Sequence, residues 1–148
     1  MANNAQTLIP MSEAARSLLT IAPFIGRAQM QALWDLCRQG EEKAFLRDLV
    51  MQWGRRIAAM PKTYEQDGKG LQAVAYLHYF LNGWDWYVTE KDASGGGFQA
   101  FGLTAGPERE MGYISLPEIT KEGAELDLHW TPKALGEIGR QEAVAGGA

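Results

Sequence analysis

The chain has 148 residues, of which 46% are hydrophobic and 22% are charged, which is the profile of one ordinary globular domain. This composition excludes a disordered or collagen-like chain, and the single cysteine, Cys37, excludes an intramolecular disulfide and fits a reducing compartment. The net charge of −4 argues against a strongly basic nucleic-acid binder and is too small for a whole-molecule DNA mimic.

Charge is distributed unequally along the chain. Residues 1–81 carry nine basic and seven acidic side chains, whereas residues 82–148 carry five basic and eleven acidic ones. No stretch has the length and apolar character of a secretory signal or a membrane span. We therefore expect a cytoplasmic protein without membrane association.

The first half of the chain predicts helices. Residues 1–25 are expected to form either a mobile arm or a short helix, because Pro23 stops a helical pattern there. Residues 27–60 are expected to be helical. Apolar residues recur at i, i+3, i+4 and i+7 from Arg27 to Gln39, and a second, longer stripe ends at Pro61.

In the second half the period changes from 3.6 to 2. Residues 73–131 are expected to form an antiparallel meander of four to five strands, with a tight hairpin at Asn82-Gly83. The last strand is expected over Ala124–Trp130, and a short helix is expected over residues 132–139. The predicted fold is a single α+β domain over residues 1–148, with the N-terminal helices packed on one face of the sheet.

Three polar residues, Glu125, Asp127 and His129, alternate along the last predicted strand. Period-2 geometry places their side chains on one face, where they could bind a divalent metal or serve acid–base chemistry together with His78. An ordinary solvent-facing strand has the same alternation, and the chain lacks an H-E-x-x-H spacing. A metal-dependent hydrolase or nuclease is therefore one alternative, and no catalytic residue, metal or cofactor is assigned.

The acidic excess of the second half favours a different use of this surface. An acidic face of the sheet could dock into a basic groove of another protein. The candidate contact residues for such a protein partner are Tyr87, Glu90, Glu125, Asp127 and His129.

Basic residues on the third predicted helix suggest a further alternative. Lys43, Arg47 and Arg55 fall on about a third of the helical circumference and could contact phosphate. A solvated helix face explains the same pattern, so nucleic-acid binding is the less favoured hypothesis.

Several short motifs follow one another in a distinctive order. They are WYVTEKD at Trp86–Asp92, FGL at Phe101–Leu103, MGYISLPEI at Met111–Ile119 and ELDLHWTPK at Glu125–Lys133. Over roughly residues 78–138 the chain resembles a bacterial family known only as a domain of unknown function (family twenty-nine fifty-eight). Members are typically encoded on plasmids, phages and integrated elements, beside transfer, replication and anti-defence genes. The resemblance implies an accessory role in a mobile element and supplies no catalytic residues.

The favoured hypothesis is thus a non-catalytic accessory protein that binds another protein. Inhibition of a host defence or nucleic-acid-processing complex is its concrete form. The sequence leaves the partner and the oligomeric state open.

Overall fold

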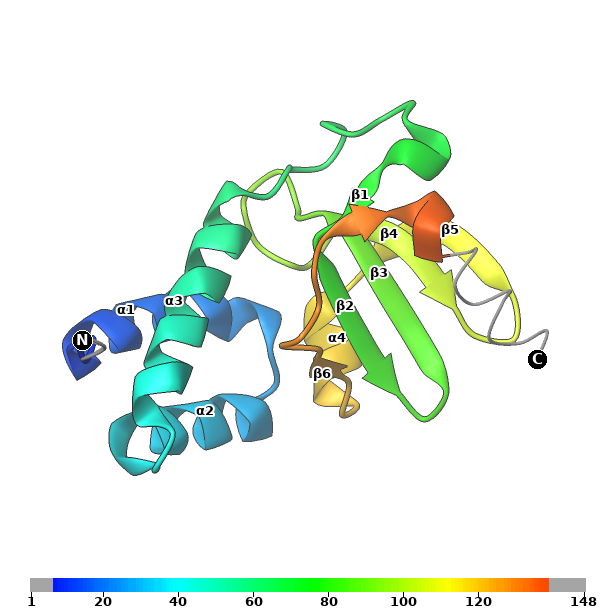
Figure 1. The fold of residues 1–148 in the computed structure, drawn as a ribbon. Coiled ribbons are helices and arrows are strands. Elements are labelled where there is room, and N and C mark those ends of the chain that lie inside the picture. Colours follow the sequence, from blue (N-terminus) through cyan, green and yellow to red (C-terminus); the bar gives the residue numbers. More distant parts are fainter. Residues whose placement is uncertain (1–6, 139–148) are drawn as a thin grey trace.

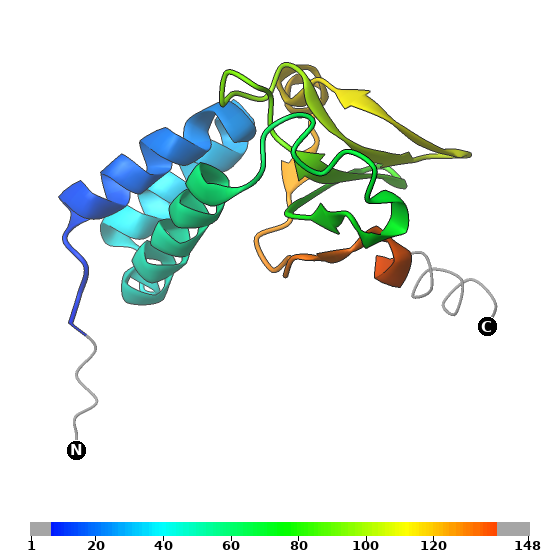
Figure 2. The same ribbon diagram turned by 90° about the horizontal axis from the view of Figure 1, so that it is seen from above.

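The computed structural model describes residues 7–138, and Figure 1 shows the N-terminal helices at one side of the molecule and the strands at the other. Three helices come first in the chain and lie together in both ribbon views (Figures 1 and 2). They are α1 (Met11–Ile21), α2 (Arg27–Gln39) and α3 (Lys43–Ala59), with a short 3-10 turn, η1 (Ala22–Phe24), between the first two. The predicted α+β class is confirmed.

Each of the three helices buries one apolar face in a common core. Leu18 of α1, Leu33 of α2 and Trp53 of α3 are all buried there. Of the two arrangements expected for residues 1–25, the described part adopts the helix, and residues 1–6 lie outside the described range. No helix within residues 7–138 is long and apolar enough to cross a membrane.

Five strands form an antiparallel sheet with the order β5-β4-β3-β2-β6. They are β2 (Leu77–Leu81), β3 (Trp84–Glu90), β4 (Ala100–Ala105), β5 (Arg109–Ile114) and β6 (Glu125–Leu126). The hairpin between β2 and β3 is confirmed. Asn82 and Gly83 have φ of 47° and 86°, and Leu81 pairs with Trp84, as a two-residue turn of this type requires.

The sheet departs from a simple meander at its last strand. Strands β2 to β5 follow one another, but β6 lies beside β2 at the opposite edge. Helix α4 (Leu116–Lys121), which the period-2 pattern did not predict, connects β5 to β6. The Ser115 hydroxyl accepts a hydrogen bond from the amide of Glu118 at 3.4 Å and so caps the helix.

The strand predicted over Ala124–Trp130 is wrong beyond its first residues. Strand β6 is confined to Glu125–Leu126; the Asp127 amide still donates to the His78 carbonyl at 2.8 Å, and the chain then turns. Asp127 causes the turn, because its Oδ1 accepts the amide of His129 at 2.9 Å and its carbonyl accepts the amide of Trp130 at 3.2 Å.

A small second sheet covers the other face of the main sheet. It pairs β1 (Val74–Ala75), which follows the 3-10 turn η2 (Gly70–Gln72), with β7 (Lys133–Ala134). The helix predicted over residues 132–139 is therefore wrong at its start. Helical conformation begins at Leu135 and continues to Ile138, the last described residue. Both residues pack against the sheet in a second core.

Candidate functional site

On the face of the sheet that β1 and β7 cover, His78 of β2 lies between two carboxylates. Its Nε2 is 2.7 Å from Oδ1 of Asp85 on β3, and its Nδ1 is 3.0 Å from Oδ2 of Asp127, which follows β6. Carboxylates only accept hydrogen bonds, so His78 satisfies both contacts when each ring nitrogen carries a proton. His78 thus connects β2 to β3 through Asp85 and to the turn after β6 through Asp127.

Two aromatic rings flank the imidazole. Tyr87 stands directly opposite His78 in the β2–β3 register, and their rings stack with centroids 4.8 Å apart. The Trp130 ring lies 5.2 Å from that of His78. Tyr87 is only 6% exposed, and burial, reinforced by the negative charge of Asp85, raises the pKa of Tyr87 to about 12.

The geometry of this cluster fits a structural role. A general base needs a free ring nitrogen that faces a nucleophile or a substrate. Both nitrogens of His78 face carboxylates, and within residues 7–138 no serine, threonine or cysteine side chain hydrogen-bonds to the ring. The cluster can hold the turn after β6 against the sheet through charge-assisted hydrogen bonds.

The structure separates the predicted trio Glu125, Asp127 and His129. Glu125 and His129 are exposed, whereas Asp127 turns towards His78. The turn breaks the alternation on which the shared face depended. Among the described residues, no group of three or more His, Cys, Asp or Glu side chains is arranged so that it could hold a metal ion. The geometry that motivated a metal-dependent hydrolase is thus not present at these three residues.

Two further predicted partner contacts are buried. Tyr87 stacks on His78, and the Glu90 carboxylate accepts the amide of Tyr64 at 2.6 Å and that of Gln66 at 3.1 Å. A β-bulge between Val88 and Glu90 interrupts the alternation of β3 at this point. Glu90 therefore organises the loop before β1 and is unavailable to a partner.

The structure does not support the basic stripe predicted on α3, because its central residue does not face solvent. Arg47 is buried, and its guanidinium donates to the carbonyls of Cys37 at 2.7 Å and Ile9 at 2.9 Å. It ties the end of α2 to the chain before α1. Lys43 is half-buried and Arg55 is exposed, so the three residues do not form one phosphate-binding surface.

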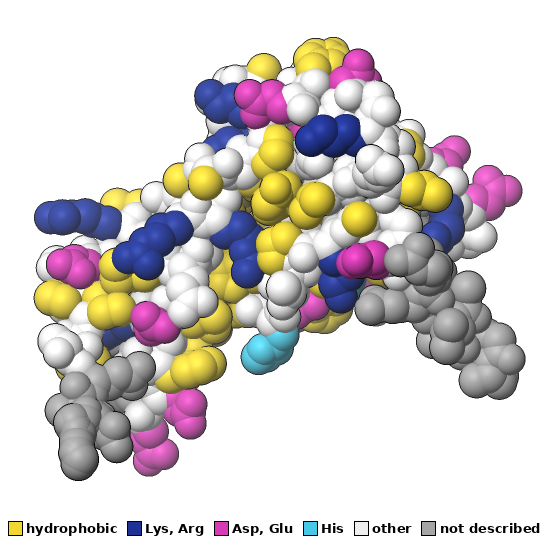
Figure 3. Space-filling model, turned by 45° about the horizontal axis from the view of Figure 1, so that its top comes forward, with side chains coloured by type: hydrophobic (Ala, Val, Ile, Leu, Met, Phe, Trp, Pro, Cys, Tyr) yellow, Lys and Arg dark blue, Asp and Glu magenta, His cyan; other side chains and the backbone are white. Residues whose placement is uncertain are grey.

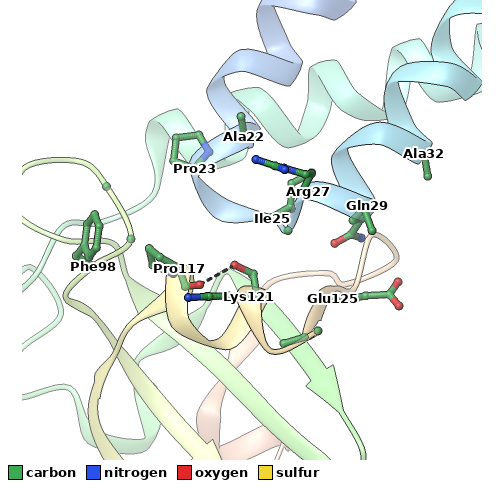
Figure 4. Close-up of a pocket in the computed structure, with 17 residues that line it drawn as sticks. Ala22, Pro23, Ile25, Arg27, Gln29, Ala32, Phe98, Pro117, Lys121 and Glu125 are labelled. Carbon is green, nitrogen blue, oxygen red and sulfur yellow. Dashed lines mark hydrogen bonds between the residues drawn. The ribbon is translucent and has the colours of Figure 1, made fainter.

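A groove with a volume of about 1040 Å³ lies between the α1–α2 junction and α4 (Figure 4). Small and apolar side chains make most of its walls. The residues that line it and carry a formal charge are Arg27, Lys121 and Glu125. In Figure 4, Arg27 and Lys121 are directed towards the end of the groove where Phe98 lies, whereas Glu125 points the other way.

The two cations of the groove have no acidic partner among residues 7–138, where the ion pairs all involve His78. Arg27 is the first residue of α2, and no side chain caps this end of the helix. Figure 3 shows another face of the molecule, on which apolar side chains gather between the helices and the sheet and both signs of charge are scattered. The acidic residues on that face therefore do not gather into one patch.

Sequence reasoning missed the groove because its residues come from three separate segments, which are residues 22–32, 96–98 and 117–125. Pro23 and Gly97 belong to none of the motifs that the sequence singles out, and Pro117 lies in the motif Met111–Ile119, to which no site was assigned. Comparisons with known proteins add no site: no family model, no curated protein and no solved structure matches the chain.

Proposed function

We propose that this protein is a non-catalytic accessory protein that binds a segment of another protein in the groove between α2 and α4. The groove carries the proposal. Its volume of about 1040 Å³ lies just above the range of about 300–1,000 Å³ that is typical of small-molecule sites, and its mostly apolar walls carry a few charged groups. The most organised polar cluster, around His78, has its hydrogen-bonding groups already in use.

The charge of the groove specifies the chemistry of the segment. Arg27 and Lys121 are directed towards the same end, and the uncapped first turn of α2 adds the positive end of a helix dipole. Phe98, which is 71% exposed, offers an apolar surface at that end. A segment that places an aspartate or glutamate next to an apolar side chain complements these features. The sequence predicted that an acidic face of this protein docks into a basic groove of its partner. Here the protein itself supplies the positively charged groove, and the partner supplies the acidic segment.

The cellular setting is part of the same proposal. The resemblance of residues 78–138 to small proteins of plasmids and phages supports an accessory role in a mobile element, with inhibition of a host defence or nucleic-acid-processing complex as its concrete form. Cys37 is buried and unpaired, which fits the reducing conditions of the cytoplasm.

Selection of short random peptides displayed against the purified protein tests the groove. We expect enriched peptides to carry a carboxylate beside an apolar residue. Their affinity, measured by fluorescence anisotropy, should fall by about tenfold or more in the double variant Arg27→Glu/Lys121→Glu, because charge-assisted contacts are lost.

The matched control is Arg55→Glu, which reverses one exposed charge on α3 outside the groove. This variant should bind the selected peptides as the wild type does. Enrichment of peptides without carboxylates, or equal binding by the double variant, would overturn the proposed site.

A further inference from the structure

A second hollow, of about 350 Å³, lies on the other side of α4. It is lined by Leu81, Trp84, Trp86, Glu118, Ile119 and Glu122. At 100° per residue, the α4 residues in this hollow lie roughly opposite those that line the groove, which are Pro117, Thr120 and Lys121. The two concavities are therefore separate surfaces.

Two tryptophans form the aromatic wall of the hollow. Trp84 and Trp86 project from the same side of β3, and their rings lie nearly parallel, with centroids 6.1 Å apart and an interplanar angle of 19°. Gly106 makes the position of the Trp84 ring possible, since a Cβ at this residue would lie 2.4 Å from a ring carbon. Trp84 is 42% exposed, so part of its ring is accessible to a ligand.

Two carboxylates complete the hollow. Glu118 lies in α4 and Glu122 directly follows this helix, four residues further on. Both side chains are exposed. Within residues 7–138 neither one forms an ion pair with a lysine or an arginine. Like charges at this spacing repel each other, and a cation bound between them would remove the repulsion.

We propose that this hollow binds the guanidinium group of an arginine that a partner protein presents. A guanidinium is planar, so it can stack on an indole face while its N–H groups donate to carboxylates. Trp84 and Trp86 supply the faces, and Glu118 and Glu122 supply the acceptors. The inference does not depend on the groove, because no residue lines both concavities.

Titration of the full-length protein with a glycine-rich peptide that carries two arginines tests the proposal. The readout is the NMR shift of the indole N–H signals of Trp84 and Trp86. We expect saturable shifts with the arginine peptide, none with a matched citrulline peptide, and weaker binding of a matched lysine peptide. The double variant Glu118→Gln/Glu122→Gln should bind the arginine peptide about tenfold more weakly.

The matched control is Glu108→Gln/Glu110→Gln, which removes two exposed carboxylates outside the hollow and should retain wild-type affinity. Gly106→Ala, whose new methyl group displaces the Trp84 ring, should weaken binding while the circular dichroism spectrum stays native. Equal binding of the arginine and citrulline peptides, an equal loss in the control variant, or tighter binding of the lysine peptide would overturn the assignment.

Discussion

The side chain of Gln29 on α2 pairs with the backbone of Leu126 on β6 as a neighbouring strand would. Its Nε2 donates to the Leu126 carbonyl at 2.9 Å, and its Oε1 accepts the Leu126 amide at 2.9 Å. Strand β6 is at the edge of the sheet, where outward backbone groups lack a strand partner. One helical side chain thus closes this edge and fixes α2 to the sheet beside the groove.

Replacement of Gln29 should therefore be costly for a residue on a helix surface. Gln29→Ala removes both hydrogen bonds and leaves the amide and carbonyl of Leu126 without these partners. We expect the free energy of unfolding to fall by about 1–3 kcal/mol in urea denaturation. Gln31→Ala on the same helix removes a single exposed contact, to Asp35, and should change stability by less than about 0.5 kcal/mol. Equal effects of the two variants would contradict the pairing.

His78 and Asp127 should be energetically coupled. A double-mutant cycle with His78→Gln and Asp127→Asn isolates their interaction, because asparagine keeps an oxygen for the amide of His129. We expect a coupling of about 1 kcal/mol in urea denaturation, a modest value because both groups are partly solvated. The control cycle pairs His78→Gln with Glu125→Gln and should show no coupling. A coupling of zero between His78 and Asp127 would argue that the turn after β6 is held by other contacts.

The helices and the first hairpin could be predicted because neighbouring residues determine them. The apolar period of residues 27–39 gave the bounds of α2, and Asn82-Gly83 gave the turn between β2 and β3. Strand β6 ends where the side chain of Asp127 accepts the amide of His129 and contacts His78, which lies 49 residues earlier in the chain. Strand periodicity contains no information about such a turn. Helix α4 has a capping serine, but its six residues are too few for a helical period to stand out.

The candidate sites were less predictable than the fold. The sequence drew attention to His78 and Asp127, but the contact between them depends on how β6 aligns with β2. Burial of Arg47 could not be foreseen, because its backbone partners lie in other segments of the chain. Arg47 lies on α3, where the helical spacing of the basic residues suggested that it belongs to a stripe that faces solvent. Charge patterns along one element thus indicate which residues are polar, but packing between elements decides which of them reach the surface.

Stability at alkaline pH should depend on Tyr87. Burial raises the pKa of Tyr87 from 10.0 to about 12 in the folded protein. Because the pKa of Tyr87 is higher in the folded protein than in the unfolded chain, the protonated hydroxyl favours the folded state. This contribution to stability is fully present below about pH 10 and is lost as the pH rises towards 12. The free energy of unfolding should therefore decline over this interval, and less steeply in Tyr87→Phe. Phe98→Leu, which replaces a 71% exposed ring that carries no titratable group, should keep the wild-type slope. The same slope in Tyr87→Phe as in the wild type would contradict the role of burial.

Lys91, which directly follows β3, should stabilise the end of α3. Its Nζ donates to the carbonyls of Ile57 at 2.7 Å and Ala58 at 2.9 Å, and the residue is only 6% exposed. The last carbonyls of a helix lack intrahelical donors and form the negative end of its dipole, so an ammonium group is well placed there. Lys91→Met keeps an apolar stem but removes both hydrogen bonds.

We expect Lys91→Met to lower the free energy of unfolding by about 1–2 kcal/mol. The loss should not be larger, because burial lowers the pKa of Lys91 and a methionine is free of the cost of burying a charge. Urea denaturation gives the change in stability, and hydrogen exchange should show faster opening of the last turn of α3. Lys69→Met, at an exposed position in the loop before β1, should alter neither measurement. If Lys91→Met matched that control, the contact between Lys91 and the helix end would contribute nothing to holding the helices against the sheet.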